Sequence, residues 1–214
     1  MKIGMIGAGH IGGTLATLLS GSGHEIAISN SRGPETLEDL TAELGGMVHA
    51  ATPAEAAAFG DLYVVCIPLG NYRDVPVGEL AGKVVIDTNN YYPGRDGHFE
   101  ELDADQTTSS ELLQAHLPDA RVVKAFNTNY WHVLRDGGRP AGAPDRVGIP
   151  IAGNDDEAKR TVAALIDEMG FDAVDVGNLG EGRRFQPGSP VYALALTAEE
   201  IRGHLGIEER PSER

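Results

Sequence analysis

Hydrophobic residues occur along the chain in short runs, separated by longer amphipathic segments. The short runs predict strands at residues 2–6, 24–29, 47–51, 61–68, 83–90, 120–127, 146–153 and 171–177. The nearly unbroken apolar run "LYVVCIP" is typical of a strand with both sheet faces covered by helices. Helices are predicted at residues 11–23, 34–46, 52–60 and 155–169. The alternation predicts an α/β fold with a doubly wound, mostly parallel sheet in a three-layer αβα arrangement.

The C-terminal segment has a different composition. Residues 178–192 form a Gly-, Arg- and Pro-rich stretch, predicted as a loop. A short helix is predicted at 197–205, with Thr197 as its cap. We therefore expect residues 1–177 to form a nucleotide-binding unit and residues 178–214 to form a loop and short helix within the same domain.

Composition and charge narrow the classes of partner. The chain has 214 residues, is 41% hydrophobic and has a formal net charge of −15. Nucleic acids and anionic membranes bind to a basic face of a protein, so neither is expected as a partner of this acidic chain. The expected partner is a small molecule. The single cysteine, Cys66, permits no disulfide within the chain, which fits a cytoplasmic protein. Neither a signal peptide nor a membrane span of roughly 20 apolar residues is visible.

The segment "IGAGHIGG" contains Gly7, Gly9 and Gly12 in the spacing G-x-G-x-x-G. In a dinucleotide site the first glycine permits a tight turn and the second lets the backbone approach a pyrophosphate. The third lets helix and strand pack closely. The motif follows the first predicted strand and opens the first predicted helix, whose N-terminus attracts phosphate. The sequence therefore predicts a Rossmann-type fold that binds a dinucleotide.

The second predicted strand ends in "SNSRG", without the carboxylate that usually binds the adenosine ribose and repels a 2′-phosphate. Asn30 and Ser31 can instead bond phosphate oxygens. Arg32 can pair with the phosphate and stack on adenine. The predicted cofactor is therefore NADP(H) rather than NAD(H).

Further contacts are expected where later strands end, because ligands bind outside the carboxyl ends of parallel strands. After the fourth strand, the backbone expected to run past the cofactor comprises Cys66, Ile67 and Pro68. After the fifth strand, Asn89 is placed to meet the nicotinamide ribose or amide. Tyr91 and Tyr92 either line a substrate pocket or belong to a surface loop.

Two residues near the sixth strand each allow two interpretations. Lys124 lies inside an apolar strand; either its stem packs on the sheet with the amine reaching the strand end, or its charge faces a ligand. His132 is a candidate proton donor for a carbonyl or imine, or the start of an ordinary helix. The acidic residues around His98 match no metal-ligand spacing, so no metal site is predicted.

Several of these segments together resemble the coenzyme F420-dependent NADP oxidoreductase family. They are "MIGAGHIGGTLA", "SNSRGPETL", "IPLGNYRDV", "VVIDTNNYY" and "VVKAFNT", with a weaker match at "RRFQPGSPVYALALTAEEIR". The run "KAFNT" also resembles the cytosolic dinucleotide domain of metal reductases that use flavin. The resemblance implies hydride transfer between NADP(H) and a deazaflavin (F420) or flavin ring.

The resemblance also implies roles for individual residues. Those implied to hold pyrophosphate are Gly7, Gly9, His10, Ile11 and Gly12, and those implied to hold the 2′-phosphate are Ser31 and Arg32. Those implied to border the nicotinamide and the acceptor ring are Asn89, Phe126 and Asn127. No catalytic side chain is assigned, because hydride transfer between rings needs little acid–base chemistry. The candidates for the acceptor pocket are Asn127, His132 and Tyr91, and residues 178–214 are expected to complete that pocket.

Other functions remain open at this point. One is reduction of a small carbonyl or imine, with His132 or Tyr91 donating a proton. Another is a non-catalytic NADP(H)-binding redox sensor with a partner surface in the C-terminal segment. A homodimer also remains open, since single-domain reductases often complete their pocket with a neighbouring subunit.

Overall fold

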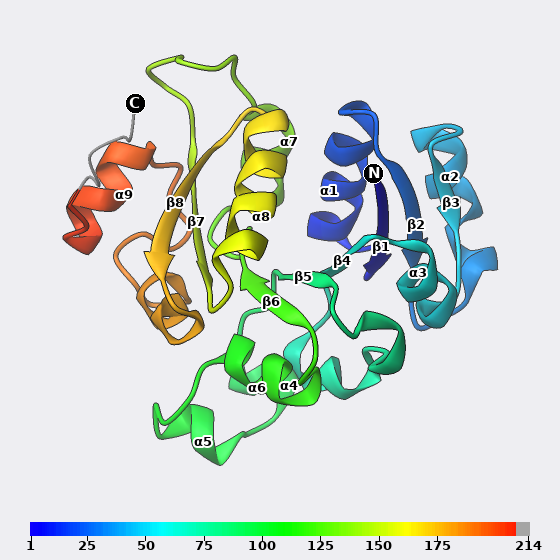
Figure 1. The fold of residues 1–214 in the computed structure, drawn as a ribbon, viewed down its shortest axis with the longest axis horizontal. Helices are drawn as coiled ribbons and strands as arrows, with labels where there is room; N and C mark the ends of the chain where they lie inside the picture. Colours follow the sequence, from blue (N-terminus) through cyan, green and yellow to red (C-terminus); the bar gives the residue numbers. More distant parts are fainter. Residues whose placement is uncertain (209–214) are drawn as a thin grey trace.

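The computed structural model describes residues 1–208, and the last six residues of the C-terminal segment, 209–214, lie outside the described part. One sheet of eight strands runs in the order β3-β2-β1-β4-β5-β6-β7-β8 (Figure 1). The strands are β1 (Lys2–Ile6), β2 (Glu25–Ser29), β3 (Val48–Ala50), β4 (Leu62–Val65), β5 (Val84–Asp87), β6 (Arg121–Lys124), β7 (Gly148–Gly153) and β8 (Asp172–Gly177). Neighbouring strands are parallel except β6 and β7, so the predicted doubly wound, mostly parallel sheet is confirmed.

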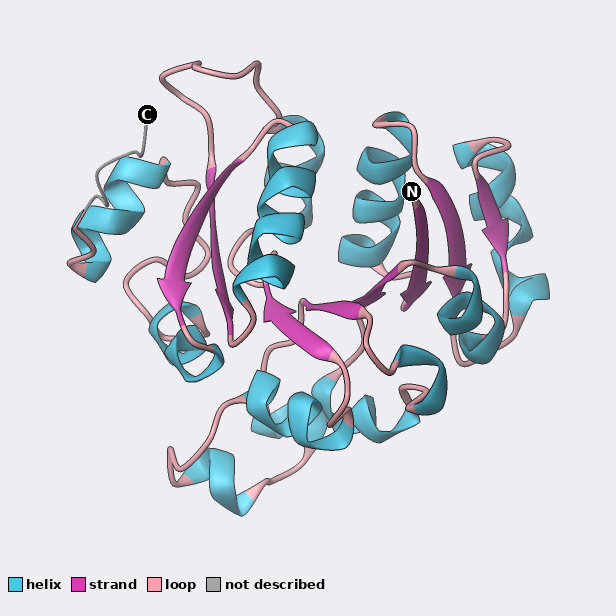
Figure 2. Cartoon of the chain, viewed as in Figure 1, coloured by secondary structure: helices cyan, strands magenta, loops and turns pink. Residues whose placement is uncertain are grey.

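Helices cover both faces of this sheet, as Figure 2 shows. They are α1 (His10–Gly21), α2 (Glu38–Leu44), α3 (Pro53–Phe59), α4 (Pro93–Asp96), α5 (Glu100–Asp103), α6 (Ser109–His116), α7 (Trp131–Asp136), α8 (Asp156–Glu168) and α9 (Ala198–Leu205). Short 3-10 helices are η1 (Pro34–Leu37), η2 (Leu69–Asp74), η3 (Gly78–Leu80) and η4 (Leu179–Phe185). Buried side chains of α1, α7 and α8 share one core with the sheet, and those of α3, α6 and η2 share a second. A third core joins α9 to β7 and β8.

Local sequence explains where several helices begin. Thr52, Thr108 and Thr197 each accept a hydrogen bond from the backbone N–H three residues on, and a glutamate there bonds back to the cap. Such a capping box satisfies helix N–H groups that otherwise lack partners. The predicted cap at Thr197 is therefore found.

The largest differences between the structure and the sequence prediction lie in three places. Residues 91–119 contain three short helices, α4 to α6, that we did not predict. Only the six-residue helix α7 lies between β6 and β7, and these strands pair antiparallel. The stretch predicted as a loop after β8 begins with the 3-10 helix η4. All three lie where the hydrophobic pattern is short or broken by glycine and proline, so periodicity gave no signal.

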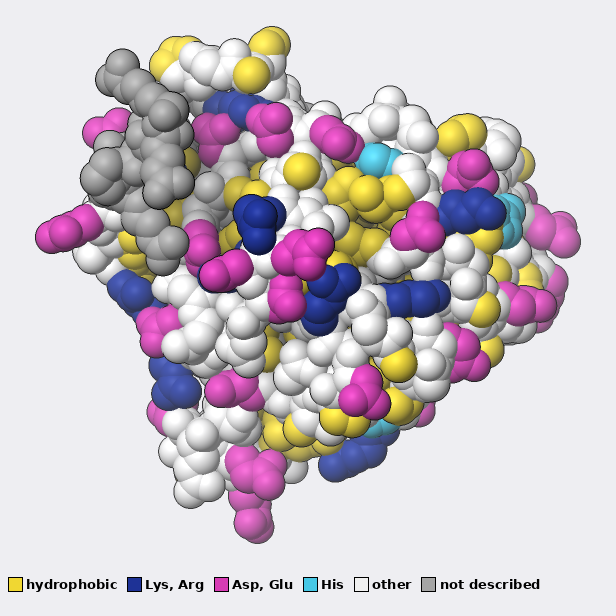
Figure 3. All heavy atoms as spheres, in the orientation of Figure 1, with side chains coloured by type: hydrophobic (Ala, Val, Ile, Leu, Met, Phe, Trp, Pro, Cys, Tyr) yellow, Lys and Arg dark blue, Asp and Glu magenta, His cyan; other side chains and the backbone are white. Residues whose placement is uncertain are grey.

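The surface agrees with the acidic composition. Figure 3 shows acidic side chains scattered over one face, with basic side chains among them rather than gathered into a basic stripe. Within residues 1–208, none of the helices combines the length and the apolar character that crossing a membrane requires.

Candidate functional site

The glycine turn joins β1 to α1 at the carboxyl edge of the sheet. Gly7 has φ +102°, in the region that favours glycine. A Cβ built on Gly12 would lie 1.9 Å from the carbonyl oxygen of Gly7, so helix and turn touch there. A Cβ built on Gly9 would meet no atom within 4 Å, so the backbone faces open space at that point. The turn thus has the geometry that a pyrophosphate requires at a helix N-terminus.

Replacing Gly12 by alanine is expected to damage this turn. The new methyl group would overlap a backbone oxygen, which cannot rotate away. We expect a loss of about 1–3 kcal/mol in the free energy of unfolding, measured by urea denaturation, together with weaker NADPH binding measured by calorimetry.

Gly13→Ala is the matched control, because it lies one residue further in α1 and its Cβ would meet nothing within 4 Å. It is expected to leave stability unchanged or to raise it by up to ~1 kcal/mol through better helix propensity. Equal behaviour of the two variants would contradict the role given to Gly12.

The loop after β2 is held by the side chain of Asn30. Its Oδ1 accepts from the backbone N–H of Arg32 and of Gly33, at 2.9 and 3.0 Å, and its Nδ2 donates to Thr36 Oγ1 at 2.9 Å. The carboxamide of Asn30 therefore shapes the loop, and the second proton of its Nδ2 remains available to a ligand. Ser31 and Arg32 at its tip are exposed, and within the described residues no ion pair involves Arg32. The guanidinium is available to a ligand.

A cleft of about 360 Å³ lies beside the glycine turn, where β4, β5 and β6 end. Residues 9–12, 66–67, 88–90 and 126–127 line it, together with the segment 129–131, Tyr92, Arg95 and Tyr192. Of the predicted cofactor contacts, Gly9 to Gly12, Cys66, Ile67, Asn89 and Phe126 meet here. Pro68 is exposed and does not line the cleft.

Two carboxamides in the cleft have atoms without partners. Asn89 is only 2% exposed, and neither its Oδ1 nor its Nδ2 makes a hydrogen bond. Asn127 donates from Nδ2 to Asn90 Oδ1 and to the carbonyl oxygen of Phe185, while its Oδ1 has no partner. Because buried polar groups are nearly always satisfied, these atoms indicate a polar ligand. The carboxamide and ribose hydroxyls of a nicotinamide nucleotide have the donors and acceptors that fit.

The backbone turns sharply at the end of β6. Phe126 has φ +59°, unusual for a residue with a side chain, and is 2% exposed. The N–H of Ala125 still bonds the carbonyl of Asp87, so the turn comes directly after the sheet ladder. Such strain costs on the order of 1–3 kcal/mol and is concentrated at functional sites. Here it brings residues 126–127 to the wall of the cleft.

Cys66 also lines the cleft but is not a reactive thiol. Burial raises its pKa to about 12, despite a hydrogen bond from Thr88 Oγ1 to its Sγ at 3.2 Å. The group is therefore a neutral thiol at neutral pH, and the thiolate that nucleophilic chemistry needs is scarce.

The tyrosines after β5 divide between two environments. The Tyr91 hydroxyl donates to Asp103 Oδ1 at 2.7 Å, and Tyr91 does not line the cleft, contrary to its place among the pocket candidates. Tyr92 lines the cleft instead, and its hydroxyl is hydrogen-bonded to that of Tyr192. Arg95 lies over the Tyr92 ring, 4.9 Å from its centroid. Burial, followed by the Tyr92 hydroxyl, raises the pKa of Tyr192, so that Tyr192 remains protonated at neutral pH.

His132, a pocket candidate that follows β6, also lies outside the cleft. His132 is exposed, stacks on Tyr130 at a centroid distance of 5.5 Å and does not line the cleft. Its neighbour Trp131 lines the cleft and stacks on His10 at 5.1 Å. Sequence reasoning missed Tyr192 as a lining residue, because its only signal was the weak C-terminal motif.

Lys124 follows the first of its two interpretations. It is fully buried, and its ammonium donates to the carbonyl of Asn89 at 2.9 Å, at the end of the strand. Burial lowers its pKa, and the nearby Asp87 opposes that shift. Its charge does not face the cleft.

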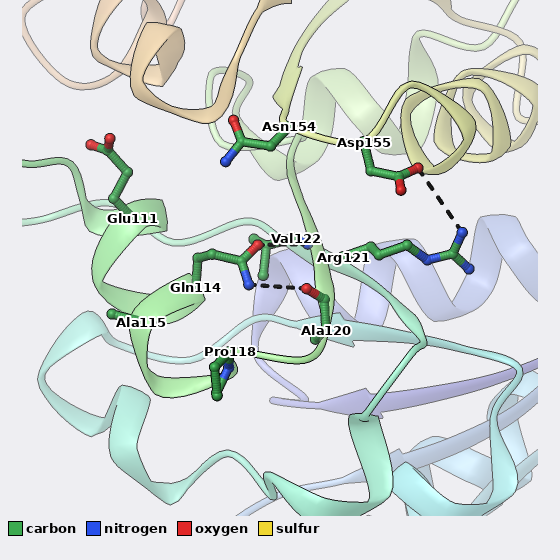
Figure 4. A pocket seen from close by; sticks show the side chains of 9 residues that line it. All are labelled: Glu111, Gln114, Ala115, Pro118, Ala120, Arg121, Val122, Asn154 and Asp155. Carbon is green, nitrogen blue, oxygen red and sulfur yellow. Dashed lines mark hydrogen bonds and ion pairs between the residues drawn. The ribbon is translucent and has the colours of Figure 1, made fainter.

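Figure 4 shows a different hollow, of about 410 Å³, between α6 and the start of α8. Its polar groups serve the fold. The Gln114 carboxamide donates to the carbonyls of Leu117 and Ala120, and Arg121 pairs with Asp155 and Glu157. The unsatisfied carboxamides and the glycine turn instead meet in the cleft at the carboxyl ends of the strands, which makes that cleft the candidate site.

The fold and this cleft define a Rossmann-type dinucleotide-binding protein. A model of the family described as "NADP oxidoreductase coenzyme F420-dependent" matches residues 2–91. A "putative F420-dependent NADP-reductase" from Arthrobacter sp. FB24 is 30% identical, with a TM-score of 0.73, over 86% of this chain and 87% of that one. The chain belongs to this family of NAD(P)-binding oxidoreductases.

Two further proteins are similar over most of this chain. The hypothetical protein SMa0349 from Sinorhizobium meliloti is 32% identical, with a TM-score of 0.80, over 92% of this chain and 95% of that one. Metalloreductase STEAP3 from Rattus norvegicus is 29% identical over 187 residues. Those residues are 86% of this chain but 36% of the metalloreductase, so the chain spans about a third of that protein's length.

Proposed function

We propose that the protein transfers a hydride between NADP(H) and a deazaflavin or flavin ring that binds in the cleft. The observation that carries the proposal is the Asn89 carboxamide, buried and unsatisfied beside the glycine turn. The free Arg32 guanidinium favours a 2′-phosphate. Family membership supports F420 as the first acceptor to test.

The chain's own residues would bind and orient the two reactants. The glycine turn holds pyrophosphate at the N-terminus of α1, and Asn89 orients the nicotinamide half. When bound, NADPH supplies the hydride itself. Trp131, Tyr92 and Phe126 provide flat, apolar walls for an acceptor ring and exclude water. No acid–base pair is required for this transfer.

The C-terminal segment takes part in the proposed site. Tyr192 lines the cleft, Phe185 and Leu194 accept hydrogen bonds from Asn127 and Asn129, and the N–H of Ala193 bonds Thr128. These contacts support the expectation that the segment from residue 178 completes the acceptor pocket while belonging to the same domain.

Oxidation of NADPH by purified protein tests this proposal. Coenzyme F420, FMN and a blank without acceptor are compared, with NADH as the control donor. Rapid oxidation with the deazaflavin supports the proposal, and oxidation with FMN supports its flavin branch. No oxidation with either, although NADPH binds, contradicts it and favours a redox sensor or a different acceptor.

A second candidate function rests on the paired hydroxyls of Tyr92 and Tyr192. The two hydroxyls have two protons, and the hydrogen bond between them uses only one. The other can be donated into the cleft, which is the requirement for reducing a carbonyl or imine. This candidate keeps NADPH as donor and replaces the predicted proton donors His132 and Tyr91.

A further inference from the structure

The Asn89 carboxamide is held in place by a buried polar network beneath the cleft. Asp87 and Lys124 end the neighbouring parallel strands β5 and β6, where they are paired in register. Both are fully buried. The Ser110 hydroxyl donates to Asp87 Oδ2 at 2.6 Å and accepts from Lys124 Nζ at 3.1 Å, so it bridges the two charges.

Two hydrogen bonds from this network hold the backbone of Asn89, one at its N–H and one at its carbonyl oxygen. Asp87 Oδ1 accepts from the N–H of Asn89 at 2.9 Å, and Lys124 Nζ donates to its carbonyl oxygen at 2.9 Å. Lys124 also donates to Ser109 Oγ at 3.0 Å, so all three of its protons have acceptors. The side chain of Asn89, by contrast, has no partner. The backbone is fixed and the carboxamide is left for a ligand.

The C-terminal segment closes the network from outside. A Cβ built on Gly182 would lie 2.8 Å from Lys124 Cδ, so η4 lies directly against the lysine stem. Burying a charge is costly unless all its hydrogen-bonding capacity is used. An apolar side chain at position 124 would pack on the sheet without that cost. The charge is therefore better explained by its hold on Asn89 than by packing.

We infer that Lys124 and Asp87 are positioning residues that aim the Asn89 carboxamide at the nicotinamide half of NADP(H). The inference rests on the proposed function only in taking this cleft as the NADP(H) site. It predicts that the network affects the nicotinamide half of the cofactor and leaves the adenosine half, held by the turn and the Arg32 loop, unaffected.

The experiment compares two ligands by calorimetry: NADPH, and adenosine 2′,5′-bisphosphate, which lacks the nicotinamide. Lys124→Met is expected to raise the Kd of NADPH about 10-fold, because well-aimed hydrogen bonds are lost. The Kd of the bisphosphate is expected to change by less than about twofold. Asn89→Ala should likewise raise the Kd of NADPH much more than the Kd of the bisphosphate.

A double variant tests whether Lys124 acts through Asn89. If it does, Lys124→Met in the Asn89→Ala background should weaken NADPH no further. Lys159→Met is the matched control, since Lys159 is 7% exposed and pairs with Asp175 away from the cleft. It should show no split between the two ligands. Ser110→Ala, which keeps the lysine, replaces Lys124→Met if that variant does not fold.

Three results would overturn the inference. The first is an equal rise in Kd for both ligands in Lys124→Met, and the second is additive rises in the double variant. The third is a rise in the Kd of NADPH, but not of the bisphosphate, in Lys159→Met as well. In each of these the wild type still binds NADPH, so the proposed function survives. A wild-type protein that binds neither ligand would instead remove the proposed function and the inference with it.

Discussion

Arg32→Ala is expected to raise the Kd of NADPH about 10-fold and to leave the Kd of NADH nearly unchanged. The guanidinium is exposed at the tip of the loop after β2, where Asn30 fixes the backbone. NADH has no 2′-phosphate, so the substitution removes no such contact from it. Calorimetry at low salt measures both constants, since salt screens an exposed pair.

Arg160→Ala is the control for net charge, because it removes the same charge from an exposed position on α8. In a protein of formal charge −15, any loss of a cation weakens anion binding slightly. Equal losses for NADPH and NADH in Arg32→Ala, or the same NADPH loss in Arg160→Ala, would show that Arg32 does not bind the 2′-phosphate.

Tyr192→Phe is expected to separate the two candidate reactions. If the acceptor is a carbonyl or imine, loss of the proton donor should lower kcat by about 10²–10⁴. With a deazaflavin or flavin, hydride transfer alone gives a reduced ring that tolerates a negative charge, so kcat should fall by less than about threefold. Steady-state NADPH oxidation with both acceptor classes gives the comparison.

Tyr91→Phe is the matched control, since its hydroxyl donates to Asp103 outside the cleft. It should leave kcat unchanged with either acceptor. An equally large loss in Tyr192→Phe for both acceptor classes would mean that Tyr192 shapes the pocket rather than donating a proton. An unchanged kcat with a carbonyl or imine that is a substrate would remove Tyr192 as the proton donor.

Short-range features of the site were predictable from the sequence. The positive φ of Gly7 and the contact between Gly12 and Gly7 follow from a glycine spacing within one strand–turn–helix unit. The missing carboxylate after β2 was equally visible, because its position is fixed by the end of a strand. Lys124 stood out as a charge in an apolar strand.

Side-chain direction was not predictable in the loop after β5 or at the start of the short helix α7. Tyr91 and Tyr92 are adjacent, and their hydroxyls bond different partners, Asp103 and Tyr192. His132 and Trp131 differ in the same way, with only the tryptophan in the cleft. Neither pair lies in a regular strand, where alternation would have fixed the faces.

The sequence by itself determined the doubly wound sheet, the glycine turn and the polar loop after β2, because each depends on residues close together along the chain. Only the tertiary structure decided the antiparallel pairing of β7, the network around Lys124 and the approach of Tyr192 to Tyr92. Tyr192 reaches Tyr92 across about a hundred residues, and Lys124 reaches Asn89 across 35. Such contacts depend on how whole elements pack against one another, which cannot be deduced from local periodicity or residue spacing.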